Sequence, residues 1–494
     1  MRLSRNVAAA MLNAGAVMGT AVIAVPLILD RVGTAGFAAW TLVGAVIAYA
    51  SILETAVGPS LQREVAVSLG AEDPDQIHRT FWTLVLVYAI LGAAAVGGLW
   101  VIGPKLVAIL DLQEPLGREA TSAYARVGVP LALVLFASGL ANFLQGLGRF
   151  APVAMSAATG GLIYLGSIVV LVGDGQLTNL VWAAALQQAS ICALRLGALW
   201  KVWTAAKVPR VLAKRDLRRV LGFSARLQPT ALSELFNWQS DKVVVGAVSS
   251  TTTLAHLGIG MQISDAGRII SGAAMNPVIA SLTRLAGAGR TAELEDRFRE
   301  LQRLWTIGLF GGAIIMAASA YPIVVAWVGR ENGEAGAFAA ILLLGSACWL
   351  SAGMGIAYLR AVGRVGLEAR YALTVLAANV VLTVVMALTV GAYGVVLGTL
   401  GAYAFGAVGF FRRLRHEIDV VPLRSPSEAG RIAAAALACA ATSCAWGVAM
   451  AGLLPQGVAL VPIGAGILAA GLVYGRVAVG LRPRRAPVRT WLPA

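Results

Sequence analysis

Residues 231–248 read ALSELFNWQSDKVVVGAV, an apolar helical stretch that carries the ionisable residues Glu234, Asp241 and Lys242. The chain around it has 494 residues, of which 58% are hydrophobic and 13% charged, and its mean hydropathy is +0.78. Apolar runs long enough to cross a bilayer recur along its whole length. The alternation typical of membrane β-barrels is absent. The composition therefore predicts an all-α polytopic membrane protein.

About fourteen apolar runs are candidate transmembrane helices. They cover approximately residues 7–29, 37–59, 82–102, 122–144, 153–172, 179–200, 222–248, 254–280, 304–328, 337–359, 369–389, 393–411, 431–452 and 458–479. Several contain Gly or Pro, which membrane helices tolerate because neighbouring helices satisfy the freed backbone groups.

The distribution of basic residues predicts how these helices are oriented. If the N-terminus is cytoplasmic, most of the 39 Lys and Arg residues lie in or beside cytoplasmic segments. The exceptions on the outer side are Arg31, Lys105, Arg118 and Arg330. Positive residues favour the cytoplasmic side, so both termini are expected there. The same distribution accounts for the net charge of +15, and no nucleic-acid partner is expected.

Two short patterns recur in the second half of the chain. GLANFLQGLGRF (139–150) is similar to GMGIAYLRAVGRV (353–365), and GPSLQRE (58–64) is similar to NPVIASLTRL (276–285). Both pairs fall at the cytoplasmic ends of corresponding spans, which predicts two pseudo-symmetric six-helix lobes followed by two extra C-terminal helices. The expected divisions are an N-lobe (1–200), a basic cytoplasmic linker (201–221), a C-lobe (222–412), a cytoplasmic loop (413–430), two further helices (431–480) and a basic cytoplasmic tail (481–494).

The polar residues of the seventh span share one helical face. Arg226, Thr230, Glu234, Asn237 and Asp241 follow one another three or four positions apart. An ionised group at the centre of a membrane helix costs roughly 2.5–3.5 kcal/mol on insertion scales. This face is therefore expected to line a wet cavity or to meet a partner helix.

The eighth span contributes Gln262, Asp265, Arg268 and Asn276. Asp265 and Arg268 are three positions apart and can pair along the helix. The alternative to a cavity role is that such groups form structural pairs, Asp265 with Arg268 and Asp241 with Lys242.

Motifs for other kinds of chemistry are absent. The chain has no GxxxxGK[ST] motif, its three histidines are scattered, and its four cysteines have neither metal-ligand nor redox spacing. No nucleophile–base pair stands out. The sequence therefore favours a secondary transporter over an enzyme, with no metal and no organic cofactor.

Residues 31–66, RVGTAGFAAWTLVGAVIAYASILETAVGPSLQREVA, resemble the start of bacterial polysaccharide exporters. These are the O-antigen and capsule flippases of the multidrug/oligosaccharidyl-lipid/polysaccharide (MOP) superfamily. The matching positions are Gly33, Gly36, Trp40, Ile52, Leu53, Glu54, Gly58 and Arg63, with Glu54 where the family often has Asp and Val57 replacing a common Leu. The LxxxGR turns (144–149 and 359–364) and the Asp241-Lys242 run are also similar to the family's pattern.

The resemblance implies a central cavity between the lobes and transport by alternating access. The substrate would be a lipid-linked oligosaccharide of the undecaprenyl-diphosphate type, moved to the outer leaflet for cell-surface polysaccharide or lipopolysaccharide biosynthesis. The implied location is the bacterial plasma membrane. The implied partners, besides substrate and membrane lipids, are a glycan polymerase or ligase and glycosyltransferases.

A cationic cavity suits a diphosphate, because Arg forks match phosphate oxygens. The candidates for substrate binding are Arg226, Asn237, Lys242, Gln262 and Arg268. The candidates for coupling to protons or Na⁺ are Glu234, Asp241 and Asp265. The candidates for structural or gating roles are Glu54, Arg63, Arg149 and Arg364.

Three alternatives stay open. A multidrug or cation antiporter would favour a cavity lined by carboxylates and aromatic residues. A lipid II flippase would show several arginines in spans one and two, whereas span one has none between Arg5 and Arg31. A non-transporting scaffold for glycan assembly would keep its function when Arg226 or Asp241 is replaced by Ala.

Overall fold

The computed structural model describes residues 2–50, 72–107, 116–173, 176–205, 239–287, 290–362, 366–416 and 426–480, with a few short pieces between 57 and 69 and at 233, 236–237, 364 and 418. All regular structure in these ranges is helical, as the all-α prediction requires. Eleven of the described helices are long and apolar enough to cross a membrane. The chain is thus a multi-pass membrane protein, and the predicted orientation of its termini stays a prediction.

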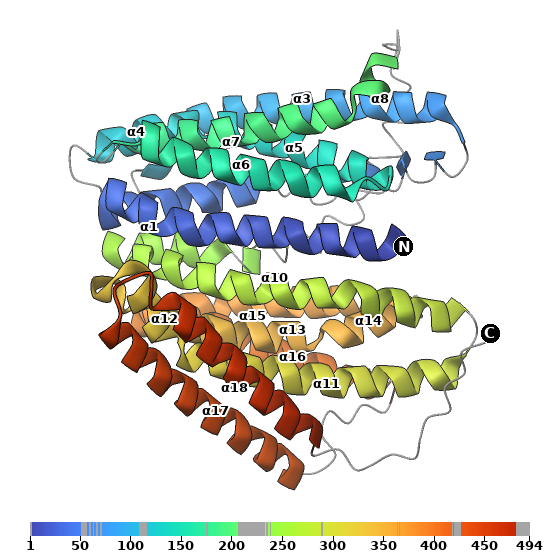
Figure 1. Cartoon of the computed structure of the whole chain (residues 1–494), viewed down its shortest axis with the longest axis vertical. Coiled ribbons are helices and arrows are strands. Elements are labelled where there is room, and N and C mark those ends of the chain that lie inside the picture. The colour runs from blue at the N-terminus through green and yellow to red at the C-terminus, as the bar shows by residue number, and fades with distance from the viewer. Residues whose placement is uncertain are drawn as a thin grey trace. The chain divides into compact units, whose positions relative to one another are not determined.

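The helices form two compact units, Met1–Gln262 with Ala372–Ala402 and Ile263–Tyr371 with Tyr403–Ala494 (Figure 1). The first unit holds α1 (Arg2–Ala50), α3 (Pro74–Val107), α4 (Leu116–Arg126), α5 (Gly128–Gly146), α6 (Phe150–Leu171), α7 (Leu177–Ala198), α8 (Trp200–Ala205) and the helical segment 239–248. The second holds α11 (Thr291–Ala318), α12 (Ala320–Val328), a 3-10 turn (Arg330–Asn332), α13 (Ala335–Ser351), α14 (Gly353–Ala361), α17 (Pro426–Leu453) and α18 (Leu460–Gly480). Three helices contribute to both units: α10 (Thr251–Gly287), α15 (Gly366–Val390) and α16 (Ala392–Leu414). The lobe boundaries drawn from the sequence remain a prediction.

The long helix α1 is interrupted at Gly33. The backbone there has φ 67° and ψ 179°, outside the helical region and strained for a residue with a side chain. The interruption falls between the first two predicted spans, and α1 contains the first span and residues 37–50 of the second. This is one reason why the eleven long helices are fewer than the fourteen predicted spans. Another is that much of the seventh span lies outside the described residues.

The two LxxxGR turns have the same backbone hydrogen bond. The amide of Arg149 donates to the carbonyl of Leu144 at 2.8 Å, and the amide of Arg364 donates to that of Leu359 at 2.8 Å. Each bond closes the C-terminal end of a helix and redirects the chain into the next one. The two turns thus share this local geometry, and the predicted repeat of two lobes stays a prediction.

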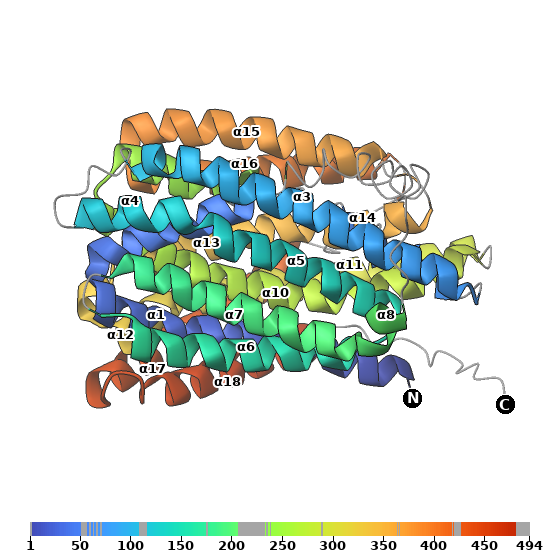
Figure 2. The same ribbon diagram turned by 90° about the horizontal axis from the view of Figure 1, so that it is seen from above.

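In the first unit, α5, α6 and α7 run side by side in both views (Figures 1 and 2). Buried Arg195 on α7 joins them, because its Nε donates to the Ser156 hydroxyl at 2.9 Å and its Nη1 donates to the Ala137 carbonyl at 2.6 Å. These two bonds give Arg195 a structural role in holding the three helices together.

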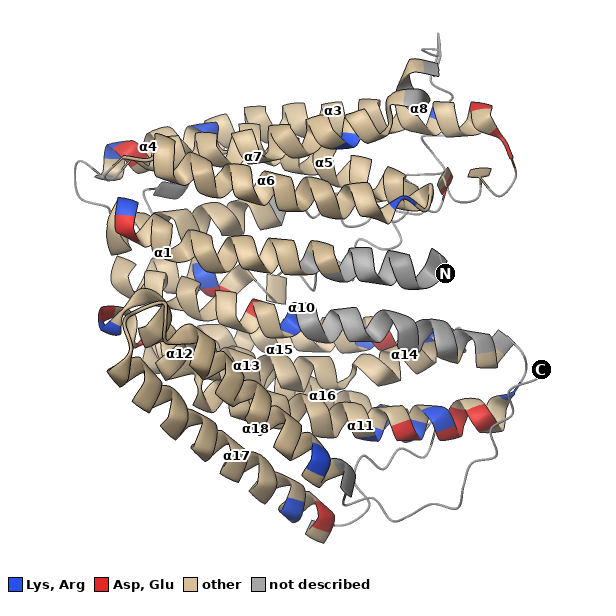
Figure 3. Ribbon diagram, in the orientation of Figure 1, with Lys and Arg blue, Asp and Glu red and all other residues tan. Residues whose placement is uncertain are grey.

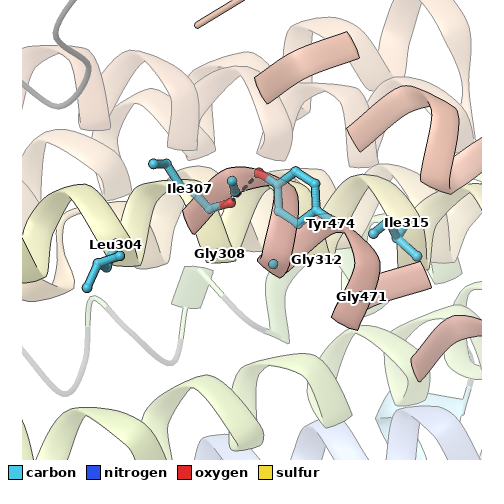
Figure 4. A pocket seen from close by; sticks show the side chains of 9 residues that line it. Leu304, Ile307, Gly308, Gly312, Ile315, Gly471 and Tyr474 are labelled. Atoms are coloured by element: carbon cyan, nitrogen blue, oxygen red, sulfur yellow. Dashed lines mark hydrogen bonds between the residues drawn. The ribbon is translucent and has the colours of Figure 1, made fainter. Parts of the chain in front are cut away.

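In the second unit, α17 and α18 pack against α11. Ile307, Ile315, Ile432 and Tyr474 belong to the apolar cluster between them, and the Tyr474 hydroxyl donates to the Ile307 carbonyl at 2.9 Å. Beside this bond a shallow cavity of about 230 Å³ opens between α11 and α18 (Figure 4). Its lining is apolar and rich in glycine. The Tyr474 hydroxyl beside it is bonded to the Ile307 carbonyl.

The Arg303–Glu428 ion pair joins α11 to the first turn of α17, and the two side chains are only 12% and 7% exposed. Replacing Glu428 with Ala leaves the guanidinium buried without this carboxylate, and breaking a buried pair costs about 3–5 kcal/mol. We expect a clear fall in the unfolding temperature of the purified protein in detergent.

Glu300→Ala is the matched control, because the Arg297–Glu300 pair of the same helix is exposed and such pairs contribute about 0–1 kcal/mol. Equal unfolding temperatures for the Glu428 and Glu300 variants would show that the buried pair does not anchor α17.

Candidate ion and substrate sites

Figure 3 shows a dense run of charged residues along one end of α11, and acidic and basic positions within α10. Asp241 lies in the helical segment 239–248 and is only 2% exposed. Asn237, one helical turn earlier, is 1% exposed. The two described residues of the predicted polar face, Asn237 and Asp241, are therefore both buried. Arg226 and Glu234, predicted on the same face, lie outside the described residues.

Three polar residues from later in the chain meet this face. Asn379 and Thr383 lie four positions apart on α15, and Thr399 lies on α16. The Asn379 amide donates to Asn237 Oδ1 at 3.1 Å, and the Thr383 hydroxyl donates to Asn379 Oδ1 at 2.8 Å. The Thr399 hydroxyl lies 2.9 Å and 3.1 Å from the two carboxylate oxygens of Asp241. We call these five residues the Asp241 network.

Several oxygens of the Asp241 network share the single hydroxyl proton of Thr399. Thr399 Oγ1 also lies 3.1 Å from Asn379 Oδ1 and 3.4 Å from Thr383 Oγ1, yet a hydroxyl carries a single proton. Donation to Asp241 leaves the other oxygens around Thr399 without that proton. Besides the Thr399 hydroxyl, the carboxylate has the positive charge of the neighbouring Lys242 beside it. Its buried oxygens could also take up a proton or a small cation.

The charge of the Asp241 network limits which cation fits it. Hard cations prefer carboxylate, amide and hydroxyl oxygens, which are the groups present. One carboxylate balances one positive charge. Within the ranges that the structure covers, no group of three or more His, Cys, Asp or Glu residues gathers as a metal site. The single carboxylate and its neutral oxygen neighbours could hold one monovalent cation.

A second charged site lies on α10. Arg268 Nη2 donates to Asp265 Oδ1 at 2.9 Å, and the two side chains are 30% and 33% exposed. The pairing along the helix that the sequence predicted is thus formed. One turn before Arg268 on α10, Ser264 bonds to Ser346 of α13 at 3.0 Å. Gln262 is exposed one turn before the pair.

The remaining candidates are spread out. Arg149 donates from Nη1 to the carbonyl of Ala198 at 3.1 Å and so caps the end of α7. Arg364 is exposed at the second LxxxGR turn, and Lys242 is partly exposed beside Asp241. Glu54 and Arg63 lie outside the described residues.

Sequence reasoning missed Asn379, Thr383 and Thr399. The available signal was the four-residue spacing of Asn379 and Thr383 in an apolar helix. That signal is weak, because single Asn and Thr residues commonly form hydrogen bonds between membrane helices.

No family model matches the chain, and no curated protein matches it in sequence. Solved structures do match. The chain is similar to the lipid II flippase MurJ in an inward closed conformation, with a TM-score of 0.70 and 12% identity over 95% of this chain and 97% of that one.

It is also similar to an inward-facing multidrug resistance MATE transporter of the MOP superfamily, with a TM-score of 0.66 and 14% identity over 81% of this chain and 94% of that one. A MOP superfamily transporter from Pyrococcus furiosus, described as having a binding pocket of reversed polarity, matches with a TM-score of 0.60 and 13% identity over 84% and 95%. The chain therefore has the fold of the MOP superfamily transporters.

Proposed function

We propose that the protein is a flippase that moves a lipid-linked oligosaccharide of the undecaprenyl-diphosphate type from the inner to the outer leaflet of a bacterial plasma membrane. Transport proceeds by alternating access and is driven by a monovalent cation, Na⁺ or H⁺, bound at the Asp241 network. The product serves cell-surface polysaccharide synthesis, with glycosyltransferases supplying the substrate and a polymerase or ligase consuming it.

The Asp265–Arg268 pair on α10 is the main support for a substrate site that binds a diphosphate. It lies near the middle of α10, and each side chain is about one-third exposed. Charges at this depth are costly in hydrocarbon, so the pair belongs beside a water-filled space. A guanidinium there matches a diphosphate, which accepts two parallel hydrogen bonds from one Arg fork.

The coverage of the structural matches favours a flippase over a multidrug antiporter. The matched MATE and Pyrococcus transporters span 81–84% of the chain, whereas the lipid II flippase spans 95%. The part of this chain that the lipid II flippase does not cover, about 5%, is shorter than the helix pair α17–α18. Most of that pair therefore has a counterpart in the flippase. This observation also supports lipid II as a second candidate substrate.

The Asp241 network supports ion coupling. Its carboxylate is buried, with neutral side-chain oxygens of α15 and α16 on one side and Lys242 next to it in the chain. Binding or release of one cation changes the charge of this group, and a change of charge can bias a transporter between two conformations.

Depletion of the protein in its native cell tests the substrate. The proposal predicts that undecaprenyl-diphosphate-linked oligosaccharide accumulates on the cytoplasmic side. Accumulation of lipid II instead would identify the second candidate substrate. A second test uses cells whose only copy is the double variant Asp241→Ala/Arg268→Ala, made at the wild-type protein level. Normal export in these cells would support a non-transporting scaffold and contradict transport by this protein.

A further inference from the structure

We propose that the C-terminal ends of α14 and α16, together with the N-terminal end of α15, form a binding surface for the headgroups of anionic phospholipids. The surface carries five exposed arginines, which we call the basic patch: Arg364, Arg370, Arg412, Arg413 and Arg415. The inference goes beyond the proposed function, because it does not depend on which substrate the protein moves.

Helix packing brings these three helix ends together. A side-chain carbon at Gly355 of α14 would lie 2.6 Å from Phe410 and 3.0 Å from Leu414 of α16, so α14 and α16 are in close contact. The ring of Tyr371, in the first two turns of α15, lies 5.1 Å from the ring of Phe410. The arginines of the basic patch lie at these same helix ends, so the packing gathers positive charges that are distant in the chain.

The basic patch has little acidic compensation. Glu368, in the first turn of α15, is buried and accepts a hydrogen bond from Arg360 Nε at 2.9 Å. Within the part of the chain that the structure describes, the three arginines of residues 412–415 form no ion pair. Glu417 and Asp419 follow in the sequence and lie outside the described residues. Even if both are counted, five arginines against two carboxylates leave a net charge of +3.

Two simpler explanations account for only part of this charge. The C-terminal end of a helix carries about half a negative charge, which a single arginine balances. Membrane topology favours positive residues on one side of the bilayer but does not require them to gather in one place. The arginines of α11 differ from those of α16, because Arg290 pairs with Glu293 and Arg297 pairs with Glu300. The unpaired charge at the end of α16 is therefore available to an external anion.

The position of the basic patch fits a phospholipid headgroup. Both α15 and α16 are long and apolar enough to cross a membrane, so their ends lie at headgroup depth. Arginine forks match phosphate oxygens. Basic clusters at the ends of membrane helices attract anionic lipids, with a gain of about fivefold in affinity for each basic residue. In the predicted orientation, the leaflet concerned is the cytoplasmic one.

The test uses the purified full-length protein in a neutral detergent. Dioleoyl phosphatidylglycerol is the anionic probe, and dioleoyl phosphatidylcholine, which has the same tails and no net charge, is the reference. The measured quantity is the mole fraction of lipid that gives half of the maximal rise in unfolding temperature, because a ligand of the native state stabilises it. The wild-type protein should respond to phosphatidylglycerol at the lower mole fraction. The variant Arg412→Gln/Arg413→Gln/Arg415→Gln should need at least about tenfold more of it.

Arg79→Gln/Arg431→Gln/Arg476→Gln is the matched control, since it removes three exposed positive charges from three different helices. It should keep the wild-type preference, and an equal loss in the control overturns the inference, because overall charge then attracts the lipid. Equal responses of the wild-type protein to the two lipids also overturn it. So does an equal response to inorganic phosphate at the same concentration as phosphatidylglycerol, which would indicate a site for free anions. None of these outcomes bears on the proposed transport.

Discussion

Asp241→Asn should abolish cation-dependent transport while the protein still folds. Asparagine has nearly the same shape and its amide oxygen can still accept the Thr399 hydroxyl, so the packing of the Asp241 network survives. The substitution removes the negative charge that balances the bound cation. We expect the cation affinity to fall by about 100-fold or more, since loss of even an outer partner of a metal site costs 10–100-fold.

Thermal unfolding measures this effect directly, because a ligand that binds the native state raises its stability. The unfolding temperature is recorded with NaCl or with choline chloride at fixed pH, and then across a pH series without Na⁺. The wild-type protein should respond to one of the two cations, and Asp241→Asn to neither. A wild-type response in Asp241→Asn would remove the network from the coupling mechanism.

Two substitutions of Thr399 serve as controls. Thr399→Ser keeps a hydroxyl beside the carboxylate and should respond to the cation almost as the wild-type protein does. Thr399→Val has a similar shape and no hydroxyl, so its response should be weaker. Equal behaviour of the two variants would show that the Thr399 oxygen is not a ligand.

Arg268→Gln should remove substrate binding and leave the cation response unchanged. The substitution deletes the charged fork on α10, and a hydrogen bond to a charged group contributes about 1.5–3 kcal/mol. The corresponding loss in affinity for the diphosphate is about tenfold to 100-fold. Titration of the purified variant with geranylgeranyl diphosphate measures it.

Arg268→Lys separates charge from geometry. Lysine keeps the positive charge without the planar fork, so its affinity should lie between those of the wild-type and Gln variants. Arg330→Gln, at an exposed position in the 3-10 turn, is the matched control and should bind normally. Wild-type affinity in Arg268→Gln would exclude this residue from the substrate site.

Local features of the structure could be predicted from the sequence. The helical class follows from long apolar runs, and the interruption at Gly33 falls between two of them. The Asp265–Arg268 pair follows from a spacing of three residues on one helix. In each case the determining residues are close in the chain, so helical periodicity is sufficient to place them.

The Asp241 network could be predicted only in part. The spacing of Asn237 and Asp241 places them on one helical face, but their partners lie 142 and 158 positions further along the chain. Periodicity within one helix cannot show which other helix packs against it. The same limit applies to the Arg303–Glu428 pair, whose members are 125 positions apart.

Flipping by the purified protein in liposomes measures the proposed transport itself. Purified protein is placed in liposomes with a fluorescent undecaprenyl-diphosphate oligosaccharide, and a membrane-impermeant quencher reports which leaflet holds the lipid. The account predicts transbilayer movement that is accelerated by a gradient of Na⁺ or of protons and lost in Asp241→Asn. Movement no faster than in protein-free liposomes, or equally fast in Asp241→Asn, would contradict it.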